Sequence, residues 1–131
     1  EKYRHPKERY LVREPEMGFG LSLERIARAH VLLKVSPMFN QGMHDRIRAG
    51  MANGAVVLTD ENPYLKRHFA DGEELMFYSL TDPDSLPAAA ERLITDFALR
   101  EEIAARASLE FEAHHTWRCR AESILKMAGG R

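Results

Sequence analysis

Two short polar stretches contain the residues best suited to hold an anionic ligand. The first, FNQGMHDR, covers residues 39–46. Gly42 permits close approach of a ligand to the backbone, and Arg46 offers a fork of hydrogen-bond donors. His44 and Asp45 are suited to contact a sugar or a base, and the free N–H groups of a helix that begins here would favour phosphate. The alternative is that Asp45 only caps this helix and that His44 is a solvated loop residue.

The second stretch, TDENPY, covers residues 59–64 and follows an apolar run. Thr59, Asp60 and Asn62 would line the same crevice if both stretches lie at one edge of a sheet. The alternative is local turn chemistry, in which Asp60 and Asn62 bond their own backbone before Pro63 begins a helix. The residue types alone leave both interpretations open.

The sequence lacks the motifs of other common functional sites. The six histidines occur without an H-E-x-x-H pattern or paired Cys/His spacing, so we expect no metal site built from protein ligands. Cys119 has no evident activating partner, and neither a G-x-S-x-G elbow nor a Walker glycine loop is present. In the HTW segment, we predict that Trp117 anchors the core and that His115 or Thr116 caps the next helix.

Composition and charge are those of an ordinary globular protein. The 131 residues are 44% hydrophobic and 30% charged, which predicts a single domain, residues 1–131, with one core. Nineteen basic and 20 acidic residues give a formal net charge of -1, so we expect no attraction of the whole chain to nucleic acid or to a membrane surface. One cysteine and no long apolar run favour a cytoplasmic protein without a membrane span.

Alternating strand and helix patterns position the two polar stretches. Strands are predicted at residues 10–16, 30–36, 55–59 and 74–79, and helices at residues 22–29, 44–54 and 62–69. This order predicts an α/β fold, a Rossmann-like three-layer sandwich with a mostly parallel sheet. Ligands of such sheets bind beyond the carboxyl ends of the strands, so the two stretches should share one edge.

The remainder of the chain has helical periodicity. Helices are predicted at residues 82–97, 98–111 and 116–130, which gives a helical C-terminal tail. The first has a stripe predicted to face the core, made of Leu86, Ala90, Leu93, Ile94 and Phe97. Gly50, inside an earlier helix, costs about 1 kcal/mol relative to alanine, which indicates close backbone packing there.

A longer series of motifs resembles a known family. The segments VSPMFNQGMHDRIRAGMANGAVVLTDENPYLKRHFADGEELMFY and HHTWRCRAESIL are similar to the C-terminal part of bacterial GT-B glycosyltransferases, of the spore-maturation CgeB-like, glycosyl transferases group 1 type. The resemblance covers residues 22–125. It rests on the order of the motifs: a His-acid-Arg stretch, a turn with asparagine and glycine, a strand ending in Thr-Asp, an Asn-Pro-Tyr-Leu helix and a closing His-Thr-Trp helix.

The resemblance implies a partial C-terminal domain of a GT-B fold that binds a nucleotide-sugar and needs no metal or other cofactor. By analogy, the residues facing the donor phosphates or sugar, or lying nearby, would be Gln41, Gly42, Met43, His44, Arg46, Asn62 and Tyr64. The chain would be the donor-binding portion of a glycosyltransferase with an unknown acceptor. Its partners would be the donor and an acceptor-binding domain elsewhere in a longer protein. Helix N–H groups and an arginine would stabilise the developing diphosphate charge.

Departures from the family pattern leave an alternative open. Related retaining enzymes have two glutamates at the positions of Gln41 and Ala49, so either another residue such as Asp45 holds the ribose or donor binding is weakened. We also expect the chain alone to be inactive, because 131 residues leave no room for an acceptor domain. The alternative is a non-catalytic interaction or scaffold domain. A free edge of an incomplete sheet would favour pairing between copies as a homo-oligomer.

Overall fold

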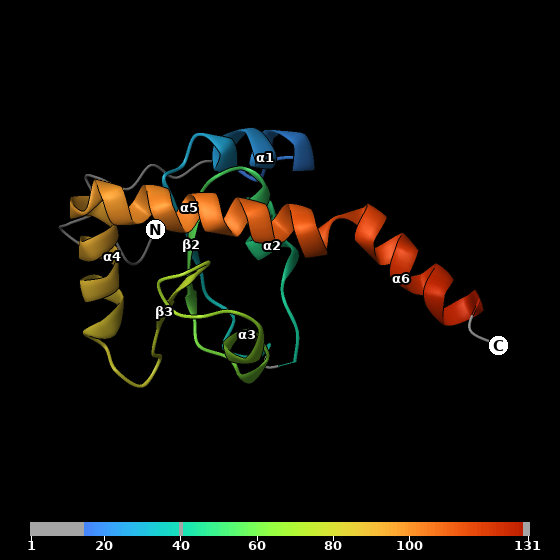
Figure 1. The fold of residues 1–131 in the computed structure, drawn as a ribbon. Coiled ribbons are helices and arrows are strands. Elements are labelled where there is room, and N and C mark those ends of the chain that lie inside the picture. Colours follow the sequence, from blue (N-terminus) through green and yellow to red (C-terminus); the bar gives the residue numbers. More distant parts are fainter. Residues whose placement is uncertain (1–14, 40, 130–131) are drawn as a thin grey trace.

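The structure, a computed structural model, describes residues 15–39 and 41–129. In chain order its elements are α1 (Phe19–Ala27), β1 (Val31–Lys34), α2 (Asp45–Ala52), β2 (Val56–Asp60), α3 (Pro63–His68), β3 (Met76–Tyr78), α4 (Ser85–Thr95), α5 (Phe97–Glu110), the π-helical turn η2 (Phe111–His115) and α6 (Trp117–Gly129). Figure 1 shows a small sheet surrounded by helices, with α6 extending away from it. The predicted α/β class and helical C-terminal region are confirmed.

The central strand of the sheet is β2. It pairs in parallel with β1 on one side and β3 on the other, in register Val31 with Val56 and Leu58 with Met76. All five residues of β2 are buried, as expected for a strand with neighbours on both sides and helices on both faces. Of the strand predicted at residues 10–16, only the last two residues are described, and they are not in a strand.

Apolar side chains form two clusters, one on each face of the sheet. The central strand contributes Val57 to the cluster that it shares with α2, and Leu58 to the cluster that it shares with α4. Helix α5 joins both clusters, through Ala107 in the first and Ile103 in the second, and both side chains are fully buried. The layers are therefore helix, sheet and helix, consistent with part of a Rossmann-like domain.

Helix α2 lies unusually close to the sheet at Gly50. A Cβ atom on Gly50 would overlap Cγ2 of Val57 and lie 3.1 Å from Cδ2 of Leu32. The close packing predicted for this glycine is confirmed. The helix ends at Asn53, and the following Gly54 has a φ of +75°, a left-handed conformation that glycine adopts without steric cost.

The predicted stripe on α4 is correct in part. Leu93 is fully buried, but Ile94 and Phe97 are 70% and 64% exposed, so the prediction is wrong for these two. The chain leaves α4 at Asp96, whose carboxylate accepts a hydrogen bond from the Leu99 amide at 2.9 Å and so begins a new helix. Because the helix is interrupted there, the stripe does not continue along a single axis.

The chain turns at η2 and continues into α6. In η2, the His115 ring lies against Phe69 with 5.7 Å between ring centroids, and its Nε2 is 3.4 Å from a carboxylate oxygen of Glu110. No residue of α6 is buried, and its Ile124 and Leu125 are exposed. Within the described ranges, no helix combines the length and apolar character needed to cross a bilayer.

Replacing Gly50 with alanine is expected to lower the free energy of unfolding by about 1–3 kcal/mol, because the methyl group meets the stiff, buried Val57. The matched control is Gly20→Ala in α1, where nothing lies within 4 Å of the added Cβ. There, helix propensity should raise the free energy of unfolding by up to about 1 kcal/mol. Urea denaturation measures both changes, and changes of the same sign would contradict this packing argument.

Candidate functional site

The carboxyl ends of β1 and β2 bring the two polar stretches together. The strands are parallel neighbours, so their exits lie at the same edge of the sheet. The Ser36 amide donates to Oδ1 of Asp60 at 2.7 Å, and the side-chain amide of Asn62 donates to the Phe39 carbonyl at 3.4 Å. The shared edge that the strand pattern predicted is therefore present.

The side chains of Thr59 and Asp60 lie within the fold, with 1% and 2% of their surface exposed. Asp60 accepts its hydrogen bond from Ser36, 24 residues earlier, and not from its own turn as the local alternative would have it. The hydroxyl of Thr59 lies 3.4 Å from the Asp60 carbonyl. These two residues thus support the edge from inside.

Asn62 and Tyr64 belong to the start of α3. Oδ1 of Asn62 accepts from the Leu65 amide at 2.7 Å, which makes Asn62 the N-cap, and Pro63 occupies the first turn. The local turn chemistry left open by the sequence thus applies to Asn62. The Tyr64 ring stacks on His68 with a centroid distance of 4.2 Å. Asn62 thus fixes the start of α3 beside the edge, whereas the stacking of Tyr64 lies within α3.

His44 begins α2 and holds its first turn. Its Nδ1 accepts a hydrogen bond from the Arg46 amide at 3.1 Å, so His44, and not Asp45, is the side-chain cap. Partial burial, followed by the positive charges of Lys34 and Arg46, lowers the pKa of the imidazole below its usual 6.5, against the opposing effect of Asp45. An accepting Nδ1 requires the neutral ring, so the proton is on Nε2, which is left as a donor.

The other residues of this loop differ in exposure. Gln41 is exposed, whereas Met43 is 6% exposed and belongs to the core cluster of α2. The side chain of Met43 therefore packs inside and does not face a ligand. Gly42 has a φ of +138°, and a Cβ there would lie 3.3 Å from the ring of Phe39. The group that approaches the backbone closely at Gly42 is thus the Phe39 ring.

The acidic and basic groups near this loop differ in whether they have partners within the chain. Asp45 is paired with Arg48 at 2.9 Å, and Asp60 is engaged by the Ser36 amide. Arg46 is exposed, and no described carboxylate lies within ion-pair distance of it. Asp45 therefore has an ion-pair partner and Asp60 a hydrogen-bond partner, whereas the guanidinium of Arg46 is exposed to solvent.

The sequence patterns did not single out three other residues of this edge: Lys34, Ser36 and Tyr78. Lys34, at the end of β1, is only 7% exposed, and its ammonium group donates to the Val35 carbonyl at 2.7 Å and to Oγ of Ser36. The Tyr78 hydroxyl donates to the Lys34 carbonyl at 3.1 Å. A lysine inside the apolar run VLLKV was the available signal, because buried lysines are rare without a reason.

The sequence between residues 21 and 126 matches the family described as glycosyl transferase-like. The chain belongs to this family. No curated protein and no solved structure matches it.

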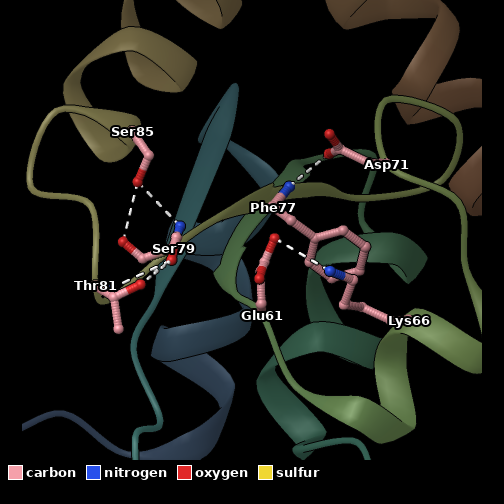
Figure 2. A network of polar contacts seen from close by, with 7 residues as sticks. All are labelled: Glu61, Lys66, Asp71, Phe77, Ser79, Thr81 and Ser85. Atoms are coloured by element: carbon pink, nitrogen blue, oxygen red, sulfur yellow. Dashed lines mark hydrogen bonds and ion pairs between the residues drawn. The ribbon is translucent and has the colours of Figure 1, made fainter.

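In this glycosyl transferase-like protein, hydroxyl groups line the exit of the third strand. The Ser79 amide donates to Oγ of Ser85 at 2.9 Å, and the hydroxyls of Ser79 and Thr81 are 2.9 Å apart (Figure 2). The same view shows Lys66 paired with Glu61 at 3.3 Å. The sequence reasoning did not select these serines, although SLTDPDS, directly after an apolar strand, carried the signal.

A second region of the glycosyl transferase-like protein lies at η2 and α6, where a hollow of about 580 Å³ is lined by Glu112, Thr116, Trp117, Arg118 and Cys119. Trp117 is 87% exposed, so the prediction that it anchors the core is wrong. It is exposed because α6 leaves the body of the domain at this point. Thr116 caps α6, since its hydroxyl accepts from the Cys119 amide at 3.2 Å, as one of the two predicted caps. Among described residues, no group of three or more His, Cys, Asp or Glu side chains is placed to hold a metal ion.

Replacing His44 with alanine should lower the free energy of unfolding by about 1 kcal/mol, because the cap on α2 is lost. The matched variant His44→Asn keeps a capping oxygen and should recover most of this loss. Urea denaturation of the three proteins measures the difference. If alanine and asparagine are equally destabilising, the imidazole does not act as a cap.

The His44 cap should also weaken in acid. Its pKa is lowered in the folded protein, so its contribution is complete above the unfolded value of 6.5 and is lost as the pH falls through the lower folded value. Unfolding free energies of wild type and His44→Asn, compared between about pH 7.5 and pH 5, should therefore diverge towards acid, with wild type losing more. Parallel curves, or an NMR titration of His44 with a midpoint above 6.5, would contradict this.

Proposed function

We propose that this chain is the donor-binding portion of a glycosyltransferase and that it holds the nucleotide diphosphate of a sugar donor at the carboxyl edge of its sheet. The acceptor would be bound by another part of a longer protein. The CgeB-like type, a bacterial origin and a cytoplasmic location stay predictions from the sequence. The family supports glycosyl transfer in general, and the arguments below support the donor.

The observation that carries the proposal is the meeting of two strand exits at an edge that exposes an arginine. Ser36 and Asp60 join the exits of β1 and β2 at 2.7 Å, so both loops are fixed relative to each other. Arg46 is exposed beside the N-terminus of α2, and the carboxylates nearby are engaged. A diphosphate is an anion that matches such an edge, because a guanidinium binds phosphate oxygens in a bidentate manner.

Hydrogen-bond donors at this edge would stabilise the nucleotide diphosphate as it leaves the sugar. Transfer of the sugar leaves negative charge on the diphosphate, and fixed donors reduce the barrier most where that charge develops. Arg46 would supply a permanent positive charge, and the neutral His44 would donate from Nε2. Gln41, which is exposed in the same loop, would contact the donor through its amide.

One observation favours the alternative, a non-catalytic domain with the same fold. The positions of the paired glutamates hold Gln41 and Ala49, and Asp45 does not replace them freely, because its carboxylate is paired with Arg48 at 2.9 Å. Alanine substitution of both His44 and Arg46 in the full-length protein separates the two functions. Loss of sugar transfer supports the donor site, whereas unchanged transfer leaves the loop a structural role.

Arg46→Ala should weaken binding of UDP or GDP by about tenfold or more, the effect of losing a charged hydrogen-bonding partner. Calorimetry measures the affinity, and NMR chemical shifts should change around residues 41–46 in the wild-type protein. The matched control is Arg118→Ala, an exposed arginine on α6, which should leave the affinity unchanged. Shifts confined to residues far from this loop would overturn the proposed function.

A further inference from the structure

The ammonium group of Lys34 is buried at the candidate site without an acidic partner. Lysine side chains that are 93% removed from solvent are normally paired with a carboxylate, because an unpaired charge is costly to bury. The two acceptors of Lys34 are the Val35 carbonyl, at 2.7 Å, and Oγ of Ser36, and both are neutral. No described carboxylate lies within ion-pair distance of its Nζ.

The acids of the same edge are engaged with other groups. Asp60 accepts from the Ser36 amide, so Ser36 stands between this carboxylate and the ammonium of Lys34. Asp45 is paired with Arg48 at 2.9 Å, and Glu61 with Lys66 at 3.3 Å. None of these carboxylates therefore contacts the ammonium of Lys34 directly, and the link to Asp60 runs through Ser36.

The position of this charge is fixed by the acceptors of Lys34. Val35 and Ser36 are the first two residues beyond β1, so the ammonium lies at the carboxyl end of the strand. Its field reaches the N-terminus of α2, since it contributes to the lowered pKa of His44. The cation thus lies close enough to the start of α2 to act on His44, two residues before Arg46.

We infer that Lys34 is a specificity-determining residue of the donor site, whose buried ammonium recognises the diphosphate of the nucleotide at the carboxyl end of β1. This inference rests on the proposed function and adds a residue to it. A pyrophosphate group carries negative charge that can pair with the ammonium directly, and a cation in a partly dry environment attracts it more strongly than one in water. A nucleoside without phosphates gains nothing from Lys34.

The substitution Lys34→Met tests this role, because methionine fills a similar apolar volume without charge. UDP affinity should fall at least tenfold, while the affinity for uridine should not change. The free energy of unfolding should stay equal or rise, because removal of a buried charge in favour of an apolar side chain is often neutral or stabilising. The two acceptors lie on the half-exposed Val35 and the partly exposed Ser36, where water can replace the ammonium.

The control is Lys66→Met, which removes an exposed lysine that is already paired with Glu61 and should leave UDP affinity unchanged. Lys34→Arg, which keeps the charge, should retain more UDP affinity than Lys34→Met. Failure of Lys34→Met to fold, or a clear loss of stability, would show a structural lysine and overturn the inference. Equal UDP affinity of wild type and Lys34→Met overturns the inference alone, whereas no UDP binding by wild type overturns the proposed function as well.

Discussion

The hydrogen bond from the Ser36 amide to the Asp60 carboxylate is the contact on which the candidate site depends. It joins the first residues beyond β1 to the last residue of β2, and both ends are fixed because the strands are paired in parallel. A carboxylate that is 2% exposed is costly to bury, and a charged hydrogen bond of 2.7 Å offsets part of that cost. The polar loops are therefore held by a hydrogen bond to a buried carboxylate at the end of the sheet, and not by their solvent-exposed residues.

The polar residues at this edge therefore fall into two groups, those that position the loops and those that are exposed on them. Asp60, Asn62 and Ser36 have their hydrogen bonds satisfied within the chain, so they position the loops. Arg46 and Gln41 are exposed on the loop that these residues support. Residue type alone does not separate the two groups, since an aspartate at a strand exit is equally suited to hold a ribose or a neighbouring backbone amide.

The sequence predicted the element order, the parallel sheet and the shared edge because these depend on local patterns: apolar runs of strand length, helical periodicity and the turn residues between them. It predicted Gly50 correctly for the same reason, since a costly glycine in a helix implies a close neighbour. It failed where tertiary contacts decide. Trp117 is a large apolar residue and was placed in the core, yet the chain leaves the domain at η2 and exposes it. Local patterns did not indicate Tyr78, because its partner, the Lys34 carbonyl, lies 44 residues away in the sequence.

The hydroxyl of Tyr78 reaches across the central strand to the backbone of β1, over a separation of 44 residues. Two crossover connections must close before this bond can form, and such closure is slow because its entropy is lost before the contact rewards it. The link between β3 and the end of β1 is thus completed only when the last strand docks. During synthesis, a nascent chain that has emerged only as far as β2 has both strand exits but lacks the bond from Tyr78 that ties the third strand to the first.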